Sequence, residues 1–534
     1  MKYSTRWALC CALGVGLAVR FFLSFYVHPG MNWDEAPQAL LARYISEGRL
    51  WPIVHFQLPY IGAVEQYPLA LFMLVFGDSV SSLRGFYFAV SALSLGGAYW
   101  LYQRVLPYNW AVVATAMFAL CLPIVLLSSL MSYSFAGLVL CTSIVLSASY
   151  SEKVHHSTTY LLLLGLVCGL ALYNNVLFIG ILLYCSWSVL QENTFKNKAL
   201  FGLGIGIGYS PMLYFNLRND FVSYKLLVSK FLRVTQAMVD EMGVFNALFM
   251  GITLKFSGEG SGFVFTDLFS YPRFDNGVGY WLQWSGLVVL CALIAGSFTT
   301  LLPRWYASNS MRKSYPRHKT FAFYITAGLV LFISLSEIRY LTAVAPIAPI
   351  MICDSLVAIE RRAVWVARSV ALFVLSYLCF VYGAAIVQYA ASANERESYE
   401  DIYQILVEEE LTFGYGSYQF QSSIAFISKG QIKISPQIGP IFLDKIPAYS
   451  QQVDQARDVF YILPQNREYL QYLDQWEISY QLQEVGQWWI AWGFSERVYP
   501  KDLLPEYEIT KTGGYLRWSY RENPAVLNVF RGGH

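Results

Sequence analysis

Long apolar runs separated by short polar breaks cover most of the chain up to residue 390. The first run, residues 7–27, has about the 20 residues that a helix needs to cross a bilayer. The same pattern predicts about eleven spans, near residues 6–27, 84–103, 110–129, 132–150, 159–173, 175–190, 199–215, 279–302, 320–336, 340–358 and 364–390. We therefore expect a mainly α fold, a polytopic bundle of membrane helices.

The pattern changes after residue 390. A polar run at 394–410 has the character of a helix. Short strand-like and helix-like stretches then alternate, at 411–416, 417–428, 431–435 and 459–463. This predicts a soluble α/β domain over 391–534 beside a membrane domain over 1–390.

Two long segments between predicted spans, 28–83 and 216–278, are expected to form large outer loops. In the first loop, residues 38–49 place apolar side chains on one helical face, which predicts an amphipathic helix at the membrane interface that begins near Pro37. Residues 67–76 are apolar but too few to cross a bilayer, so we expect them to lie in the interface or re-enter it.

Four glycines alternate with apolar residues along 202–208, inside the seventh predicted span. A nucleotide-binding glycine loop follows a strand, and no strand precedes this run. Small residues in membrane helices allow two backbones to approach closely. The run therefore predicts close packing between helices.

Composition agrees with a membrane protein. Of the 534 residues, 56% are hydrophobic and 13% are charged, whereas soluble domains average about 25% charged residues. A net charge of +2 gives no indication of a nucleic-acid partner.

The basic residues of the short loops all fall on one side of the predicted membrane: Lys2, Arg6, Arg104, Lys153, Lys196, Lys198, the segment 304–319, Arg361 and Arg362. Positive loops face the cytoplasm. The N-terminus is then cytoplasmic, the first span is retained, and an odd number of spans puts the tail outside.

Two neighbouring carboxylates, Asp34 and Glu35, follow the first span directly. A carboxylate in mid-bilayer costs about 2.5–3.5 kcal/mol on insertion scales, so the pair is expected at the membrane edge. This position suggests chemistry at a membrane surface. A structural alternative is that Asp34 caps the helix that follows and Glu35 interacts with the helix dipole.

Four motifs, taken in order, resemble those of the GT-C membrane glycosyltransferases, particularly the branch of protein O-mannosyltransferases and lipid A aminoarabinose transferases. They are Asp34-Glu35 with Ala42-Arg43-Tyr44, the segment 65–69 with Phe76-Gly77 and Arg84, the segment 211–224, and Arg339-Tyr340 with Pro346 and Pro349. The chain departs from the usual pattern at four places. Gln66 and Tyr67 replace Lys and Pro, while Phe215 and Asn219 replace Trp and His.

The resemblance implies a multi-pass protein of the bacterial inner (plasma) membrane. It would transfer a hexose or pentose from a polyprenyl-phosphate donor to a hydroxyl of a glycan, lipid or protein acceptor, on the extracytoplasmic face. Asp34 is the implied general base, and Glu35 would orient it or contact substrate. The implied substrate-binding residues are Glu65, Tyr67, Asn216, Asp220, Arg339 and Tyr340. No cofactor is certain; a divalent cation is an option, and no metal ligands can be assigned.

The main alternative is a transporter or lipid-carrier flippase without transferase activity. Transport sites place ionisable groups near the middle of the bilayer. Here the predicted spans carry almost no charge, and the acids lie at one rim, which favours chemistry at the surface. Arg339 could instead pair with Glu337, and Asp220 could be a solvated loop charge.

Overall fold

A computed structural model describes residues 3–27, 31, 35–55, 58–120, 135–150, 157–225, 227, 289, 292–294, 296, 345–391, 399–438 and 446–503. The chain divides into two compact units. The helical unit comprises Met1–Val27, Tyr60–Glu65 and Arg84–Ala391. The second unit, here called the loop–tail unit, comprises His28–Pro59, Gln66–Leu83 and Ser392–His534. Much of the first outer loop therefore groups with the tail, which a division at residue 390 does not anticipate.

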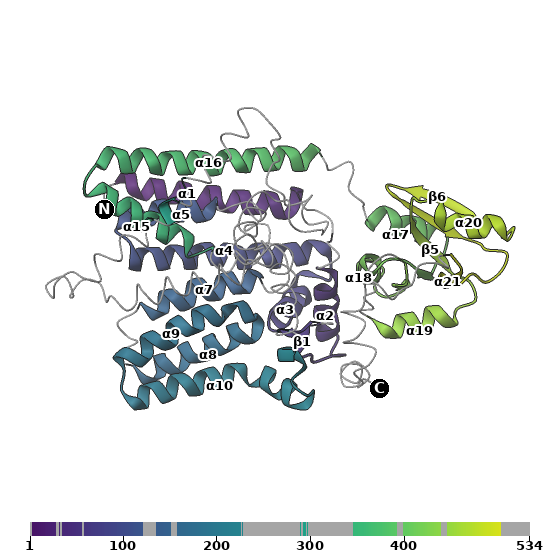
Figure 1. Cartoon of the computed structure of the whole chain (residues 1–534), viewed down its shortest axis with the longest axis horizontal. Helices are drawn as coiled ribbons and strands as arrows, with labels where there is room; N and C mark the ends of the chain where they lie inside the picture. Colours follow the sequence, from purple (N-terminus) through teal and green to yellow (C-terminus); the bar gives the residue numbers. More distant parts are fainter. Residues whose placement is uncertain are drawn as a thin grey trace, which may run out of the picture. The chain divides into compact units, whose positions relative to one another are not determined.

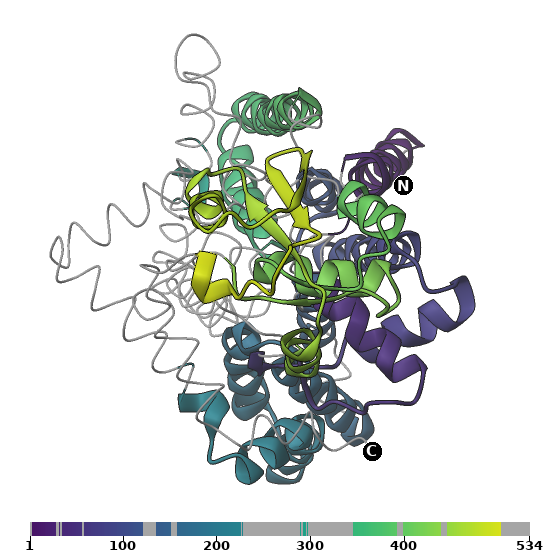
Figure 2. The same ribbon diagram turned by 90° about the vertical axis from the view of Figure 1, so that its right-hand side faces the viewer.

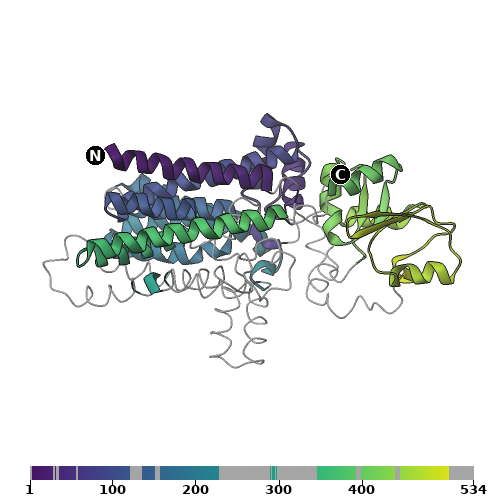
Figure 3. The ribbon, with the colours of Figure 1, turned by 90° about the horizontal axis from the view of Figure 1, so that it is seen from above.

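The helices of the helical unit lie side by side along one direction (Figures 1 and 3). They are α1 (Tyr3–Phe22) with the π-helical turn η1 (Leu23–Val27), α4 (Val80–Val105, whose first four residues belong to the other unit), α5 (Tyr108–Ala119), α7 (Phe135–Ser149), α8 (Thr158–Asn174), η3 (Val176–Phe178), α9 (Ile179–Glu192), α10 (Phe195–Arg218), α15 (Ala348–Glu360) and α16 (Val364–Ala391). Their buried faces share one continuous apolar core.

Three segments are long and apolar enough to cross a membrane, namely Arg6–Tyr26, Phe195–Arg218 and Val364–Val381. Among the described residues there are also shorter apolar helices, at Gln66–Phe76, Phe135–Ser149, Thr158–Asn174 and Val176–Leu190. The count of eleven spans stays a prediction. Almost all of the predicted span 279–302, and all of 320–336, lie outside the described residues.

Glycines set the spacing between α8 and α10. A Cβ on Gly165 or Gly169 would overlap backbone of α10, and a Cβ on Gly204 or Gly208 would overlap backbone of α8. Each helix therefore presents a small-x-x-x-small pair to the other, the arrangement that lets membrane helices approach closely. The predicted role of the 202–208 run is confirmed for these two glycines, whereas Gly202 has open space around its Cβ position.

Polar contacts bring three basic or polar loops to the same end of the helical unit. Arg104 donates to the carbonyl of Ser147 (3.0 Å) and Tyr160 to that of Ala148 (3.0 Å). In the first turn of α5, Trp110 donates to a carboxylate oxygen of Glu360 (2.6 Å). The C-terminal ends of α4, α7 and α15 thus lie at one end of the helical unit, as the sorting of positive charges predicts.

Arg20 is a buried cation inside the first predicted span. Its side chain donates to the carbonyl oxygens of Gly16 (3.1 Å) and Ala119 (3.0 Å) and to the hydroxyl of Ser91 (3.0 Å). Ala119 ends α5, where the last carbonyls of a helix have no partner within it. Arg20 therefore caps α5 from a neighbouring helix.

In the first outer loop, α2 (Ala36–Ser46) packs against α3 (Gln66–Phe76). The short strands β1 (Val54–His55) and β2 (Leu58–Gly62) lie between them in sequence. Pro37 occupies the first turn of α2, as predicted. The predicted polar face of 38–49 is wrong at Gln38 and Arg43, which are buried like the leucines, whereas Glu47 and Arg49 are exposed as predicted. On α3, by contrast, Leu71, Leu74, Val75 and Phe76 are exposed.

The tail contains a five-stranded sheet in the order β4-β3-β5-β7-β6, whose strands face the viewer in Figure 2. Its elements are α17 (Tyr399–Glu408), β3 (Phe413–Tyr415), α18 (Tyr418–Ile427), β4 (Lys433–Ser435), α19 (Pro447–Gln455), β5 (Phe460–Pro464), α20 (Glu468–Gln475), β6 (Gln481–Val485), β7 (Trp488–Trp492) and α21 (Pro500–Leu503). The strands β3, β4 and β5 are parallel, joined through α18 and α19, and the β6–β7 hairpin is antiparallel.

The predicted tail stretches each contain the expected kind of element, from the helix within 394–410 to the strand near 459–463. The β6–β7 hairpin was missed. Its signal is a two-residue turn that begins at Gly486, whose φ of +57° suits glycine at a tight hairpin. Tyr415, Tyr461 and Trp489 contribute to the apolar core on one side of the sheet.

Candidate active site

The first functional prediction, Asp34, lies outside the described residues. Glu35 immediately precedes α2 and is buried, with 1% of its surface exposed. Its carbonyl accepts the backbone N–H groups of Gln38 and Ala39, both at 3.0 Å. Its backbone is helical, and its carboxylate makes no capping bond to the helix. The structure therefore places Glu35 at the N-cap position of α2, which the structural alternative gave to Asp34, without a capping hydrogen bond from its carboxylate.

The helix that begins at Glu35 is held on one side by α3. Gln66 donates a side-chain hydrogen bond to the side-chain oxygen of Gln38, and both residues are fully buried. Buried amides need such partners because an unpaired polar group costs free energy away from water. Gln66 stands where the resembled family usually has lysine, so its amide here serves the packing of α2 on α3.

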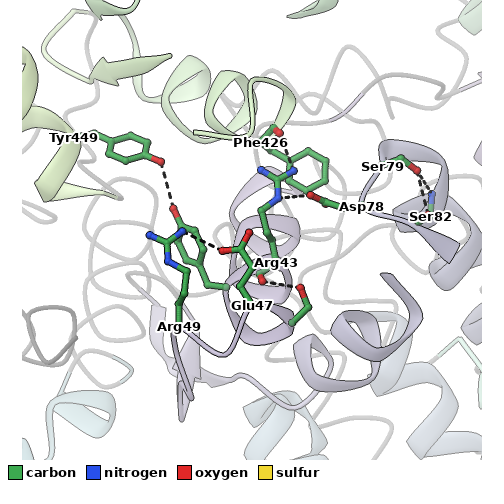
Figure 4. A network of polar contacts seen from close by, with 10 residues as sticks. Arg43, Glu47, Arg49, Asp78, Ser79, Ser82, Phe426 and Tyr449 are labelled. Carbon is green, nitrogen blue, oxygen red and sulfur yellow. Dashed lines mark hydrogen bonds and ion pairs between the residues drawn. The ribbon is translucent and has the colours of Figure 1, made fainter. Parts of the chain in front are cut away.

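Arg43, two turns along α2, is the most connected side chain of the helix (Figure 4). Its Nε donates to a carboxylate oxygen of Asp78 (2.5 Å), and one Nη donates to the carbonyl oxygen of Phe426 (2.9 Å) in α18 of the tail. The guanidinium also lies over the Phe426 ring, 4.2 Å from its centroid. The sequence showed this arginine only as part of a motif, and its contacts could not be foreseen.

Glu65 is buried in the helical unit. Its Oε1 accepts the backbone N–H of Gly137 (2.9 Å), in the first turn of α7, and the amide of Asn174 (3.0 Å) at the end of α8. Its Oε2 has no hydrogen-bond partner among the described residues. Burial raises the pKa of Glu65 from 4.5 to about 7, against the opposing effect of its two hydrogen bonds.

Tyr67, in the first turn of α3, is partly buried. Its hydroxyl donates to the carbonyl oxygen of Pro52 (2.9 Å), and its ring stacks on Trp51 with the centroids 6.3 Å apart. Burial raises the pKa of the Tyr67 hydroxyl, so it stays a neutral donor at physiological pH. Trp51 itself is 72% exposed and offers an aromatic face to solvent or ligand.

Asn216 and Asp220 lie at the C-terminal end of α10. The buried amide of Asn216 donates to the carbonyl of Met212 (2.9 Å) and accepts the backbone N–H of Ser223 (3.2 Å), so it organises the turn that follows. Asp220 adopts a left-handed backbone (φ +51°) in that turn. Its exposed carboxylate pairs with Lys225.

The two remaining predicted contacts, Arg339 and Tyr340, lie outside the described residues. Arg84, an alternative cation, is buried at the start of the helical unit's share of α4. Glu35 and Tyr67 belong to the loop–tail unit, whereas Glu65, Asn216 and Asp220 belong to the helical unit.

The sequence did not decide whether the protein binds a metal ion. In the parts of the chain that the structure describes, no three or more His, Cys, Asp or Glu side chains gather closely enough to hold a metal ion. Asp220, an acidic residue of the predicted second outer loop, forms an ion pair with Lys225.

Comparison with known proteins gives a result only at the level of structure. No protein-family model and no curated protein matches the sequence. The structure, however, is similar over 93% of its length to an oligosaccharyltransferase from Archaeoglobus fulgidus, solved tethered to an acceptor peptide (TM-score 0.55, 12% identity, 74% of that chain covered). It is similar over 91% of its length to ArnT from Cupriavidus metallidurans bound to undecaprenyl phosphate (TM-score 0.54, 14% identity, 98% of that chain covered).

The chain has the GT-C glycosyltransferase fold. A second structure of the Archaeoglobus oligosaccharyltransferase, in complex with Zn and sulfate, also shares this fold (TM-score 0.52, 13% identity, with 92% of this chain and 73% of that chain covered). The resemblance read from the sequence motifs is thereby confirmed for the architecture.

Proposed function

We propose that the protein transfers a sugar, a hexose or a pentose, from a polyprenyl-phosphate donor to an acceptor hydroxyl on the extracytoplasmic face of the membrane. The observation that carries this proposal is the fold, because two solved transferases that share it were captured with an acceptor peptide and with undecaprenyl phosphate. Asp34, which directly precedes Glu35 in the sequence, would supply a base beside a predicted membrane edge.

In the proposed reaction, the acceptor hydroxyl oxygen attacks the anomeric carbon of the donor. The bond from that carbon to the lipid phosphate oxygen breaks, and the phosphate leaves with the bonding electrons. Asp34 takes the proton of the attacking hydroxyl, which requires its carboxylate within hydrogen-bond reach of that oxygen. Glu35, fixed at the first turn of α2, would orient Asp34 or contact the acceptor.

The leaving phosphate carries negative charge and needs cationic or hydrogen-bonding groups. We assign this role to Arg339, with Tyr340 beside it, and a donor-binding role to Tyr67. Glu65 and Asn216 are proposed contacts of the donor sugar; Glu65 would use Oε2, the oxygen without a hydrogen-bond partner among the described residues. Asp220 would be a second acid, provided that substrate displaces Lys225. A divalent cation remains a proposed addition, and no step of this mechanism depends on it.

The proposed setting is a bacterial inner membrane, with the N-terminus in the cytoplasm and the 391–534 tail outside. The proposed acceptor is a hydroxyl group on a glycan, a membrane lipid or a protein. A flippase for the same lipid carrier is the competing function, and it would move the carrier without breaking the sugar–phosphate bond.

The test compares membrane lipids and envelope glycans by mass spectrometry, with wild-type protein, without the protein, and with Asp34→Asn. We expect a polyprenyl-phosphate sugar to accumulate without the protein and equally with Asp34→Asn. Glu47→Gln, a change in an exposed acid on the same loop, serves as the control and should behave as wild type. Normal sugar transfer by Asp34→Asn would remove Asp34 from the mechanism, and an unchanged lipid profile in all strains would contradict the transferase.

A further inference from the structure

Arg43 connects the helix that follows the acid pair to the tail, more than 380 residues later in the sequence. The Arg43 side chain is 6% exposed, so its charge has little access to water. A buried guanidinium is tolerated only when it is paired and hydrogen-bonded. Here Asp78 supplies the counter-charge and the carbonyl of Phe426 supplies a second acceptor.

The acceptor carbonyl lies at the C-terminus of α18. The helix ends in a Schellman arrangement, in which Gly430 N–H bonds to the carbonyl of Ala425 (2.8 Å) and Lys429 N–H to that of Phe426 (3.2 Å). The last carbonyls of a helix carry the negative end of its dipole. A cation placed there is favoured by the dipole as well as by the hydrogen bond, and the Phe426 ring adds a cation–π contact.

A second contact joins the next residue of α2 to another helix of the tail. The hydroxyl of Tyr44 lies 3.4 Å from the hydroxyl of Tyr449 in α19, and the Arg49 guanidinium lies over the Tyr44 ring (4.6 Å to its centroid). Figure 4 shows both contacts reaching from α2 to different parts of the tail. Two successive residues of α2, Arg43 and Tyr44, therefore contact α18 and α19 respectively.

These contacts act on the end of α2 that carries the acids. Arg43 is eight residues after Glu35, about 12 Å along a helix that rises 1.5 Å per residue. The helix is continuous between them, and its first turn is closed by bonds to the Glu35 carbonyl. A rigid helix transmits a shift or rotation at Arg43 to its first turn, and so to Glu35 immediately before it.

We propose that Arg43 is a positioning residue through which the tail fixes the start of α2 and Glu35, the residue next in sequence to the proposed base, so that the tail forms part of the catalytic unit. The proposal rests on the function proposed above, since it gives Asp34 the role of base. It gives the tail a role, which the resemblance to the GT-C family did not specify. A purely structural role for Arg43 is the competing explanation.

The test uses the full-length protein in detergent micelles with Arg43→Gln, and Arg467→Gln as the matched control. Arg467 is an exposed arginine of the tail, outside the contacts between α2 and the tail described above. Hydrogen exchange is followed in the peptides of α2 and α18. We expect Arg43→Gln to raise exchange at least tenfold in both helices, and Arg467→Gln to leave both unchanged.

Turnover is then measured with the polyprenyl-phosphate sugar purified from membranes of cells that lack the protein. Arg43→Gln should lower kcat at least tenfold while the KM for this donor stays within twofold, because misplacing the base affects the chemical step and leaves donor binding intact. Arg43→Lys keeps the charge beside Asp78 and should recover part of the loss. If Arg43→Gln does not accumulate, Arg43→Lys takes its place and should show smaller changes in the same directions.

Two results would overturn the proposal. One is unchanged exchange in α18, and the other is raised exchange in both helices with kcat unchanged. A failure of the proposed function gives a different result, namely an unchanged lipid profile in cells that lack the protein. In that case hydrogen exchange in α2 and α18 still tests whether Arg43 couples the two helices.

Discussion

Arg20, Arg43 and Glu65 are buried ionisable groups, and each contacts the end of another helix. The two arginines meet C-terminal carbonyls, of α5 and α18, and the carboxylate of Glu65 meets an N–H in the first turn of α7. The signs match the helix dipole, which favours cations at the C-terminus and anions at the N-terminus. Helix ends that lie in low-dielectric surroundings are thus satisfied by side chains from elsewhere in the chain.

Glu65 should make the stability of the protein depend on pH. Its pKa of about 7 in the folded state lies above its ordinary 4.5, so the folded state holds a proton that the unfolded chain releases. The free energy of unfolding is therefore highest below pH 4.5 and falls, by an amount on the order of 3 kcal/mol, as the pH rises to 7. Glu65→Gln should remove this slope, as measured by thermal unfolding in detergent between pH 4.5 and 8.

The control for this measurement is Glu47→Gln, because Glu47 is an exposed acid of the same outer loop. It should keep the wild-type slope. A slope that is the same in Glu65→Gln and wild type would show that Glu65 does not hold the proton.

At the scale of elements, the α8–α10 pair shows how finely the sequence specifies packing. Four glycines alternate along 202–208, but only Gly204 and Gly208 face α8. The other two have open space around them. Helical periodicity explains the difference, because residues four apart share a face and residues two apart do not.

Gly204→Ala should destabilise the helical unit by about 1–3 kcal/mol, since the added methyl must push backbone away from backbone. Gly202→Ala and Gly206→Ala are the matched controls on the same helix. They should be neutral or stabilising by up to about 1 kcal/mol, because alanine has the higher helix propensity. Thermal unfolding of the purified variants measures the difference, and equal melting temperatures for all three would refute the close approach.

At the scale of the whole molecule, the first outer loop and the tail form one unit, although more than 300 residues separate them. Both must therefore lie on the same side of a membrane. The loop between α9 and α10 lies beside Lys196 and Lys198 in the sequence, two of the basic residues that predict the cytoplasmic side. The topology can be tested without any knowledge of the substrate.

Single cysteines at Arg49 and Trp476, both exposed, should react with an impermeant maleimide added to intact cells. A cysteine at Phe195, which is 87% exposed, should react only after the membrane is opened. The native cysteines are replaced beforehand to lower the background. Labelling of Arg49→Cys and Trp476→Cys from opposite sides would contradict the loop–tail unit.

The sequence by itself determined the kind and place of most elements. Apolar length and periodicity located the helices, the change of pattern after residue 390 located the strands β3, β4 and β5 of the tail, and the glycine run indicated close packing. These signals are local, because a helical face or a missing Cβ depends on a few neighbouring residues. The motifs also indicated the GT-C fold, which the comparison of structures confirmed.

Only the tertiary structure decided which polar groups are buried and what they meet. The 38–49 segment has the pattern of an interface helix, yet α2 is buried because α3 covers one side and Phe426, 383 residues after Arg43, meets another. Glu65 likewise finds Gly137 and Asn174 across the helical unit. Such partners are distant in sequence. The residues around a charged side chain therefore do not show whether it will be solvated or will bind the end of another helix.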